Sequence, residues 1–437
     1  MILFFRLLWY DNYMILWGDK VKKKLSAVIK KTKKKLNFKK IFSKNKDDGF
    51  NIFEVVVIIF ISVLFGIIVG CIISTSNLGL VGKEASEELQ EVISTYTNIV
   101  DEYYEDVDEK DLMNAAISGM VSILNDPYST YLDNNQTYSF NQSVDGEYVG
   151  LGITITWTDG DCTITEVVKD SPAEKAGLKV DDLIVAVDKN DITKSTLEEI
   201  SQLLTGKKGT SVKLEVMREG ERLKLEVTRD IIQIQSVFSS IKDNNIGYIK
   251  IDNFAANTFK QFEKELKKLE KKKIESLIID VRCNTGGRLN QVNEILDMFL
   301  GKNVEIYRIE TKGKQKKVYT TDKTTRNYPV VVLVDEGSAS ASEILASAFH
   351  DKYKKATIVG VTTYGKGSIQ KAVELPGGSS LKYTTQRWLT SKGKSLQDKG
   401  LTPDVEVEQS KEYYENQTEE NDAQLQKALE VLNKKES

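Results

Sequence analysis

The chain has 437 residues, which is enough for two or three domains, and 40% of them are hydrophobic. Its net charge is −3, but residues 1–75 carry 14 lysines and arginines against 5 aspartates and glutamates, whereas the remainder carries 47 against 59. The three cysteines, Cys71, Cys162 and Cys283, are far apart and have neither a metal-binding spacing nor the pattern of a disulfide framework.

The N-terminal part predicts a membrane anchor. Residues 20–46 contain 13 lysines, a composition that suits either nucleic acid or anionic lipid. Residues 55–73 contain no charge and are long enough to span a bilayer, which favours lipid. Because lysines keep their end of a span in the cytoplasm, we expect a cytoplasmic segment of residues 1–50, a transmembrane helix in residues 51–75, and an extracytoplasmic remainder. The sequence leaves open whether residues 1–17 are a second membrane-associated piece or precede the true start at Met14.

Two further regions lie between the predicted anchor and the core. Residues 76–145 predict a helical region, with apolar residues at helical spacing in 86–104 and 110–124. Residues 146–230 predict a separate small domain that opens with a strand at Gly150-Leu151-Gly152-Ile153. Within it, residues 196–204 form a helix with Leu197 and Ile200 on one face, and a hairpin follows at 212–229.

Residues 231–408 predict an α/β core, because strands and helices alternate along them. The expected strands are 246–254, 276–281, 328–334, 356–361, 381–389 and 405–408, and the helices between strands are 258–271 and 289–300. Residues 409–437 form a tail, with a loose polar stretch at 409–417 and a last amphipathic helix at 422–432.

The clearest candidate for a nucleophile lies in residues 330–349. Val330–Val334 reads as a buried strand, and residues 339–349 read as a helix. Ser338, Ser340 and Ser342 lie where the strand turns into the helix, where free helical N–H groups can stabilise an oxyanion. The alternative is that these serines only cap the helix.

Histidine cannot activate such a serine within this chain. His350 is the single histidine and lies ten residues after Ser340, roughly 15 Å along the same helix. Lysine is the usual substitute, and Lys366 is the candidate because glycines flank it and an apolar run precedes it. A lysine base needs a pKa around 7–8, which burial can supply. Gln370 could orient its amine without adding charge, and the alternative is that Lys366 is an ordinary surface lysine.

Six motifs in order resemble one known family. They are DPYSTYL at 126–132, GYIKIDNF at 247–254, LIIDVRCNTGG at 277–287, GSASASE at 337–343, YGKGSIQ at 364–370 and KGLTPDVEV at 399–407. This set resembles the carboxyl-terminal processing peptidases, or tail-specific serine proteases. Cys283 and Thr285 depart from the pattern, since the family more often has Asn and Pro there.

The resemblance implies roles for particular residues. It makes Ser340 the nucleophile, Lys366 the general base and Gln370 the residue that holds the lysine. The oxyanion hole would be formed by the N–H of Ala341 with that of Gly286 or Gly287.

The resemblance also implies the fold. The core would share the crotonase and Clp-protease fold, and residues 146–230 would be a PDZ domain. Peptide binding there would use Leu151, Gly152, Ile153, Leu197 and Ile200, with loop N–H groups on the terminal carboxylate and the tail added as a strand. The helical region would contribute to a homodimer.

The sequence therefore predicts a single-pass, membrane-anchored serine endopeptidase that cleaves proteins near exposed carboxyl-terminal tails, with no metal or other cofactor and no nucleic-acid partner. Two alternatives remain at this stage. One is a catalytically inactive tail-binding adaptor on the same scaffold, and the other is a membrane-bound assembly platform that works through dimer contacts.

Overall fold

The computed structural model describes residues 59–63, 66, 86–158 and 160–434. The predicted cytoplasmic segment and most of the predicted span at 55–73 lie outside these residues. Within the described ranges, no helix is both long enough and apolar enough to cross a membrane.

The chain divides into two compact units, residues 1–106 and 107–437. In the first, helix α4 (Glu87–Glu102) begins and ends within a residue or two of the prediction and buries none of its residues. Leu89, Val92 and Ile93 are all exposed on it, so α4 presents an exposed apolar face.

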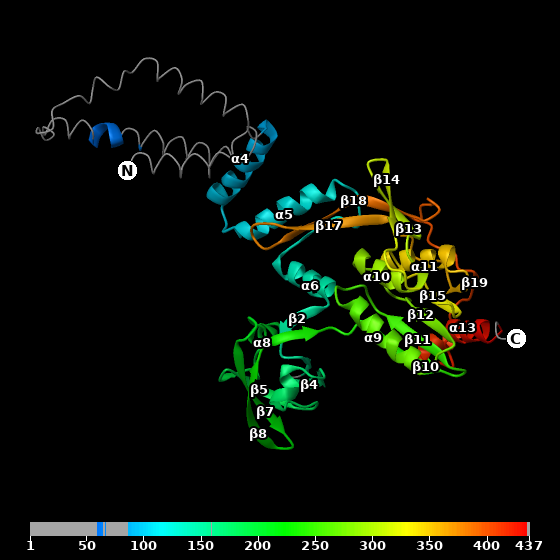
Figure 1. The fold of residues 1–437 in the computed structure, drawn as a ribbon. Helices are drawn as coiled ribbons and strands as arrows, with labels where there is room; N and C mark the ends of the chain where they lie inside the picture. Colours follow the sequence, from blue (N-terminus) through cyan, green and yellow to red (C-terminus); the bar gives the residue numbers. More distant parts are fainter. Residues whose placement is uncertain (1–58, 64–65, 67–85, 159, 435–437) are drawn as a thin grey trace, which may run out of the picture. The chain divides into compact units, whose positions relative to one another are not determined.

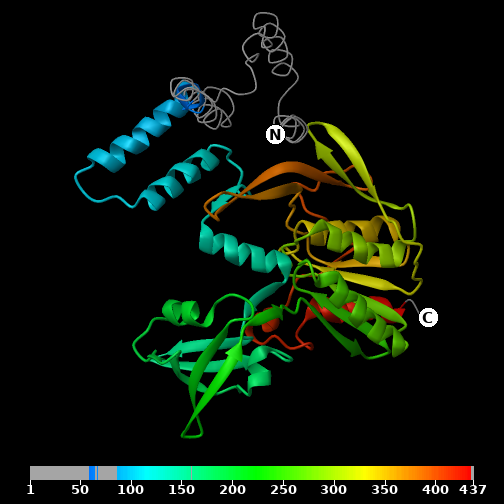
Figure 2. The ribbon, with the colours of Figure 1, turned by 60° about the vertical axis from the view of Figure 1, so that its left-hand side comes forward.

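The core of the second unit is a six-stranded sheet in the order β10-β11-β12-β15-β16-β19 (Figures 1 and 2). Strand β10 is antiparallel to β11, and the other neighbours are parallel. The strands are β10 (Val237–Lys242), β11 (Ile246–Ile251), β12 (Ser276–Asp280), β15 (Val330–Val334), β16 (Ala356–Gly360) and β19 (Val405–Glu406).

Helices cover both faces of this sheet. Val330, Val332 and Val334 of β15 pack in the cluster that includes α9 (Thr258–Lys271), α10 (Leu289–Leu300) and α11 (Ala341–Lys352). The intervening Val331 and Leu333 pack in the cluster that includes α13 (Ala423–Lys434). This two-sided burial explains why the strand is an unbroken apolar run.

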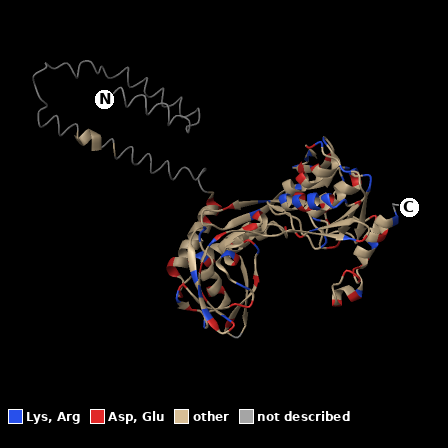
Figure 3. Ribbon diagram, turned by 60° about the horizontal axis from the view of Figure 1, so that its bottom comes forward, with Lys and Arg blue, Asp and Glu red and all other residues tan. Residues whose placement is uncertain are grey.

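A second sheet, in the order β1-β18-β13-β14 with β17 also paired to β18, lies in the same unit. Its strands are β1 (Thr130–Leu132), β13 (Glu305–Thr311), β14 (Lys314–Tyr319), β17 (Ser368–Glu374) and β18 (Ser380–Thr390). The sequence did not predict β13 and β14, because β14 is lysine-rich and the apolar residues of β13 are interrupted by Glu305, Arg308 and Glu310 without regular alternation. Figure 3 shows acidic and basic residues interspersed over the ribbon rather than gathered on one face.

The predicted small domain contains a six-stranded sheet in the order β3-β4-β5-β7-β8, with β6 also paired to β5. Its strands are β3 (Ile153–Thr158), β4 (Asp161–Val167), β5 (Leu183–Val187), β6 (Asn190–Asp191), β7 (Ser211–Arg218) and β8 (Glu221–Thr228), and its helices are α7 (Pro172–Ala176) and α8 (Leu197–Leu204). The chain enters along β2 (Glu147–Gly150) and leaves along β9 (Asp230–Gln233), and these two strands pair with each other.

Some predicted boundaries were wrong. Helix α11 starts at Ala341 rather than Ala339, since Ser340 has φ 54° and ψ −110°, which no α-helix accommodates. The expected strand at 150–153 is split, because β2 ends at Gly150 and β3 begins at Ile153.

The stretch 409–417 is not loose. It contains helix α12 (Lys411–Glu415), and the Gln409 side chain hydrogen-bonds both Asp422 and the backbone of Ala423. Two further helices lie before the small domain: α5 (Glu109–Ser122) and the unpredicted α6 (Asn134–Asp145).

Candidate active site

Ser340 occupies the sharp turn between β15 and α11. Its positive φ is a costly conformation for a residue with a side chain, worth about 1–3 kcal/mol. Gly286 lies directly against it, because a Cβ added to Gly286 would come within 2.9 Å of the Ser340 Cβ. The turn therefore requires glycine at this neighbouring position, which the sequence supplies.

The three serines of the turn differ in their exposure and in the hydrogen bonds of their hydroxyl groups. Ser338 is fully buried, and its hydroxyl donates to the Val281 carbonyl at 2.8 Å. Ser342 is also fully buried, and its hydroxyl donates to the Asn284 carbonyl at 2.8 Å. Ser340 alone among the three is partly exposed, so its hydroxyl is the one that an external substrate can reach.

The predicted oxyanion donors are close to one another. A Cβ on Gly286 would lie 3.0 Å from the Ala341 nitrogen, so the glycine loop and the start of α11 are in contact. The Gly286 N–H, however, donates to Asn284 Oδ1 at 2.8 Å. Among the hydrogen bonds of the described residues, none uses the N–H of Ala341 or of Gly287. Of the two glycine alternatives, Gly287 is therefore the one with a free donor.

Lys366 lies in the loop that leads into β17. Its backbone is fixed at both ends, because its N–H donates to Glu343 Oε2 at 2.8 Å and its carbonyl accepts from Trp388 Nε1 at 2.8 Å. The Nζ atom lies 4.7 Å from the centre of the Tyr128 ring. Burial lowers the pKa of Lys366, Lys382 lowers it further, and Asp126 and Glu343 oppose the shift.

Not all the predicted contacts are present. Within the described ranges, no hydrogen bond joins Ser340 Oγ to Lys366 Nζ, and none joins Gln370 to Lys366. The Gln370 amide instead donates to Ser368 Oγ at 2.8 Å and to Thr384 Oγ1 at 3.1 Å. His350 lies in the last turn of α11, at the opposite end from Ser340, and pairs there with Asp351 and with Asp404 from the segment before β19. This position agrees with its exclusion as the base.

The sequence reasoning missed Glu343. This residue is fully buried in the first turn of α11, and both its carboxylate oxygens accept hydrogen bonds. The N–H of Ser340 donates to Oε2 at 2.8 Å, and donors of the Lys366 loop fill the remaining sites. The Ser-x-x-Glu spacing of a capping box was the available signal, but it predicts only the contact within the helix.

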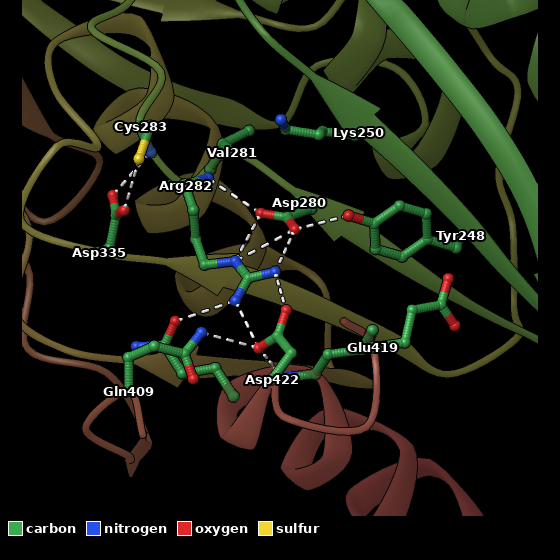
Figure 4. A network of polar contacts seen from close by, with 12 residues as sticks. Tyr248, Lys250, Asp280, Val281, Arg282, Cys283, Asp335, Gln409, Glu419 and Asp422 are labelled. Atoms are coloured by element: carbon green, nitrogen blue, oxygen red, sulfur yellow. Dashed lines mark hydrogen bonds and ion pairs between the residues drawn. The ribbon is translucent and has the colours of Figure 1, made fainter. Parts of the chain in front are cut away.

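Arg282 anchors the loop that carries Gly286 and Gly287 to the C-terminal segment (Figure 4). The guanidinium contacts Asp280 at 2.7 Å and Asp422 at 2.8 Å, so it fastens α13 to the end of β12. Both carboxylates raise the pKa of Arg282 against the opposing effect of burial. Asp335 holds the same loop from the other side, since it accepts from the Cys283 N–H at 2.8 Å and from the Gly337 N–H at 3.0 Å.

The predicted peptide-binding residues of the small domain have different exposures. Leu151 and Ile200 are buried in its core, Ile153 is half-buried, and Leu197 is exposed. Gly152 has φ 83°, and a Cβ there would come within 2.4 Å of the Ser171 Cβ, so this position requires glycine. Gly152 therefore lies in the bend between β2 and β3 rather than inside the expected strand, and two of the five predicted side chains serve packing.

Comparison with known proteins agrees with this architecture. Three family profiles match the chain: the activating protease CtpB N-terminal domain over residues 75–136, the PDZ domain over residues 149–228, and peptidase family S41 over residues 245–407. The chain is 37% identical over 340 residues to carboxy-terminal processing protease CtpA of Bacillus subtilis, covering 76% of this chain and 73% of that protein. It is 39% identical over 333 residues to carboxy-terminal processing protease CtpB of the same organism, covering 75% and 69%.

A solved structure of the photosystem II D1 C-terminal processing protease matches 74% of this chain and 88% of that chain, at 27% identity and a TM-score of 0.42. Together, the fold and the sequence matches define a serine peptidase with a PDZ domain. The chain belongs to peptidase family S41, among the carboxy-terminal processing proteases.

Proposed function

We propose that this peptidase cleaves proteins near their carboxyl-terminal tails by a Ser340/Lys366 dyad. Ser340 Oγ attacks the peptide carbonyl, and neutral Lys366 takes its proton and passes it to the leaving amine. Water then hydrolyses the acyl-enzyme. The N–H groups of Ala341 and Gly287 bind the developing oxyanion.

The observation that carries this proposal is the shared anchoring of the two residues. The backbone N–H groups of Ser340 and Lys366 donate to one oxygen of one buried carboxylate. This keeps the two segments adjacent, and burial shifts the pKa of Lys366 downward, which is the direction that a lysine base needs. The Lys366 amine lies over the Tyr128 ring, and no hydrogen bond among the described residues joins it to Ser340; catalytic hydrogen bonds often form only once substrate is bound.

The test is cleavage of casein and of a protein with an exposed unstructured tail by the full chain in detergent. Ser340→Ala and Lys366→Ala should each abolish turnover, with the wild-type circular dichroism spectrum retained. If Lys366→Ala cleaves at the wild-type rate, the dyad is wrong. Tail binding without turnover by the wild-type chain would instead support a tail-binding adaptor.

The PDZ domain is proposed to capture the substrate tail and to license the active site. A free carboxylate suits the N–H groups around Gly152, and the edge of β3 can add the tail as a strand. Deletion of residues 146–230 should change the cleavage of a tailed substrate far more than that of a short peptide. Equal cleavage of the tailed substrate before and after deletion would contradict the gating role.

The remaining proposals concern location and assembly. The uncharged stretch 55–73 supports a single-pass anchor with a cytoplasmic N-terminus and an extracytoplasmic catalytic part. Protease added to intact cells should then degrade the catalytic part and spare an N-terminal tag.

The exposed apolar face of α4 supports a homodimer. Chemical cross-linking of the full chain in detergent should yield a dimer band that Val92→Glu weakens. A monomer at all concentrations would contradict it.

A further inference from the structure

Glu343 is the most completely engaged carboxylate near the proposed dyad. Its side chain is 0% exposed. Oε2 accepts from the N–H groups of Ser340 and Lys366, each at 2.8 Å. Oε1 accepts from the Gly365 N–H at 2.8 Å and from Thr363 Oγ1 at 2.6 Å. All four partners are donors, which matches an acceptor-only carboxylate.

A helix cap explains only one of these four bonds. The Ser340 contact is the intrahelical part of a capping box, and it would exist in any helix with this Ser-x-x-Glu spacing. The other three donors belong to residues 363–366, which lie 20 to 23 positions further along the chain. They come from a different segment, so capping does not account for them.

We infer that Glu343 is a positioning residue of the peptidase, which holds the Ser340 turn and the Lys366 loop in register so that the hydroxyl and the amine can meet. This inference rests on the proposed dyad. The inference adds to the dyad the residue that sets the distance between Ser340 and Lys366. Because Ser340 has a positive φ, its turn needs such an external restraint to persist.

Thr363 links the Glu343 carboxylate to one further segment of the chain, at Leu401. Its hydroxyl donates to Glu343 Oε1 and accepts from the Leu401 N–H at 2.7 Å, and its side chain is buried. Thr363 is outside α11, so it offers a way to weaken this link without touching the helix cap.

The test compares acylation of Ser340 by a fluorophosphonate probe, together with kcat and KM for a short peptide, across five variants of the full chain. Glu343→Asp keeps the charge but shortens the side chain by one methylene, so it cannot reach both segments. Thr363→Val keeps the shape and removes one donor. Both should slow acylation, Glu343→Asp by about 100-fold, which is the cost of a misplacement of about 1 Å. The loss should be in kcat with little change in KM.

Glu343→Gln provides a second readout, the pH dependence of acylation. The titratable groups that face Lys366 are Asp126, Tyr128, Glu343 and Lys382. Glu343→Gln removes one of the two negative charges that favour the ammonium form, so the acid limb of the profile should move to lower pH. Glu343→Asp and Thr363→Val should leave that limb in place while lowering the plateau.

Glu199→Gln is the matched control. Glu199 forms the same capping box in α8, where its Oε2 accepts from the Thr196 N–H at 2.8 Å, and no second segment of the described chain donates to it. It should acylate within twofold of the wild type. Folded Glu343→Asp and Thr363→Val variants that also acylate within twofold would overturn the inference. If the Glu343 variants do not fold, Thr363→Val decides alone.

Lys366→Met separates this inference from the proposed function. An inactive Lys366→Met with normal Glu343→Asp and Thr363→Val overturns only the positioning role. A fully active Lys366→Met overturns the dyad itself, whatever the Glu343 variants do.

Discussion

The amine of Lys366 lies over the ring of Tyr128, with 4.7 Å between Nζ and the ring centre. A cation over an aromatic face is stabilised by about 0.5–2 kcal/mol, depending on how far the site is desolvated. This contact favours the charged amine, whereas burial lowers the pKa of Lys366. Tyr128 therefore holds the side chain in place but opposes the deprotonation that a general base requires.

The first prediction concerns this contact. Tyr128→Leu removes the aromatic face, so the pKa of Lys366 should fall. The acid limb of kcat/KM against pH should then move to lower pH by up to about one unit, since one pKa unit corresponds to 1.36 kcal/mol. Tyr128→Phe keeps the ring and is the control, with the limb expected where the wild type has it. A Leu variant with an unmoved limb would show that the ring does not set the pKa.

A second prediction concerns stability and pH. Burial lowers the pKa of Lys366 from its ordinary 10.5, so the unfolded state binds more protons than the folded state between the folded pKa and 10.5. Stability therefore rises with pH across that window. Lys366→Met should be more stable than the wild type at neutral pH, and the gap should close as pH approaches 10.5. Urea unfolding of both chains at several pH values measures the gap, and a constant gap would contradict the assignment.

A third prediction concerns the C-terminal segment. Asp422 is buried, and its pKa is lowered because the Arg282 contacts outweigh the opposing effect of burial. Asp422→Ala leaves a buried guanidinium short of a partner, which should cost about 3–5 kcal/mol. Calorimetry of the full chain should show a lower melting temperature, and proteolysis should cut within residues 409–421.

Glu419→Gln is the control for Asp422→Ala. Glu419 lies in the same segment as Asp422 and pairs with Lys242 of β10; its own side chain is 67% exposed, whereas that of Lys242 is 10% exposed. Because the Glu419 carboxylate faces water, its loss should lower the melting temperature less than the loss of the buried Asp422 carboxylate. Equal effects of the two substitutions would mean that burial of the Arg282 contacts contributes nothing.

A fourth prediction concerns Cys283, which is exposed beside the glycine loop. Although the residue is exposed, partial desolvation of its thiol, followed by the Asp335 hydrogen bond, raises the pKa of Cys283 to about 11. Its alkylation by iodoacetamide at pH 7.5 should be on the order of tenfold slower than that of a free thiol, because the smaller thiolate fraction outweighs the greater nucleophilicity. The rate should climb until about pH 11. Cys283→Ser assigns the signal, and fast labelling at neutral pH would contradict the raised pKa.

The sequence by itself determined the features that depend on neighbouring residues. The apolar run Val330–Val334 predicted a strand buried on both faces, and α9 and α10 have the bounds that their periodicity predicts. The ordered motifs identified the family. These signals are local, because a residue's burial and backbone preference leave a pattern within a few positions of it.

Only the tertiary structure decided which side chains meet. Glu343 joins the turn of Ser340 to a loop more than 20 positions away, and Arg282 joins Asp422 across 140 positions. In the structure, the Gly286 N–H donates to Asn284, and Gln370 hydrogen-bonds Thr384 rather than Lys366. The physical reason is that a hydrogen bond needs its two partners about 3 Å apart, and for segments far apart in sequence that distance is set by how the two sheets pack, which no short run of residues encodes.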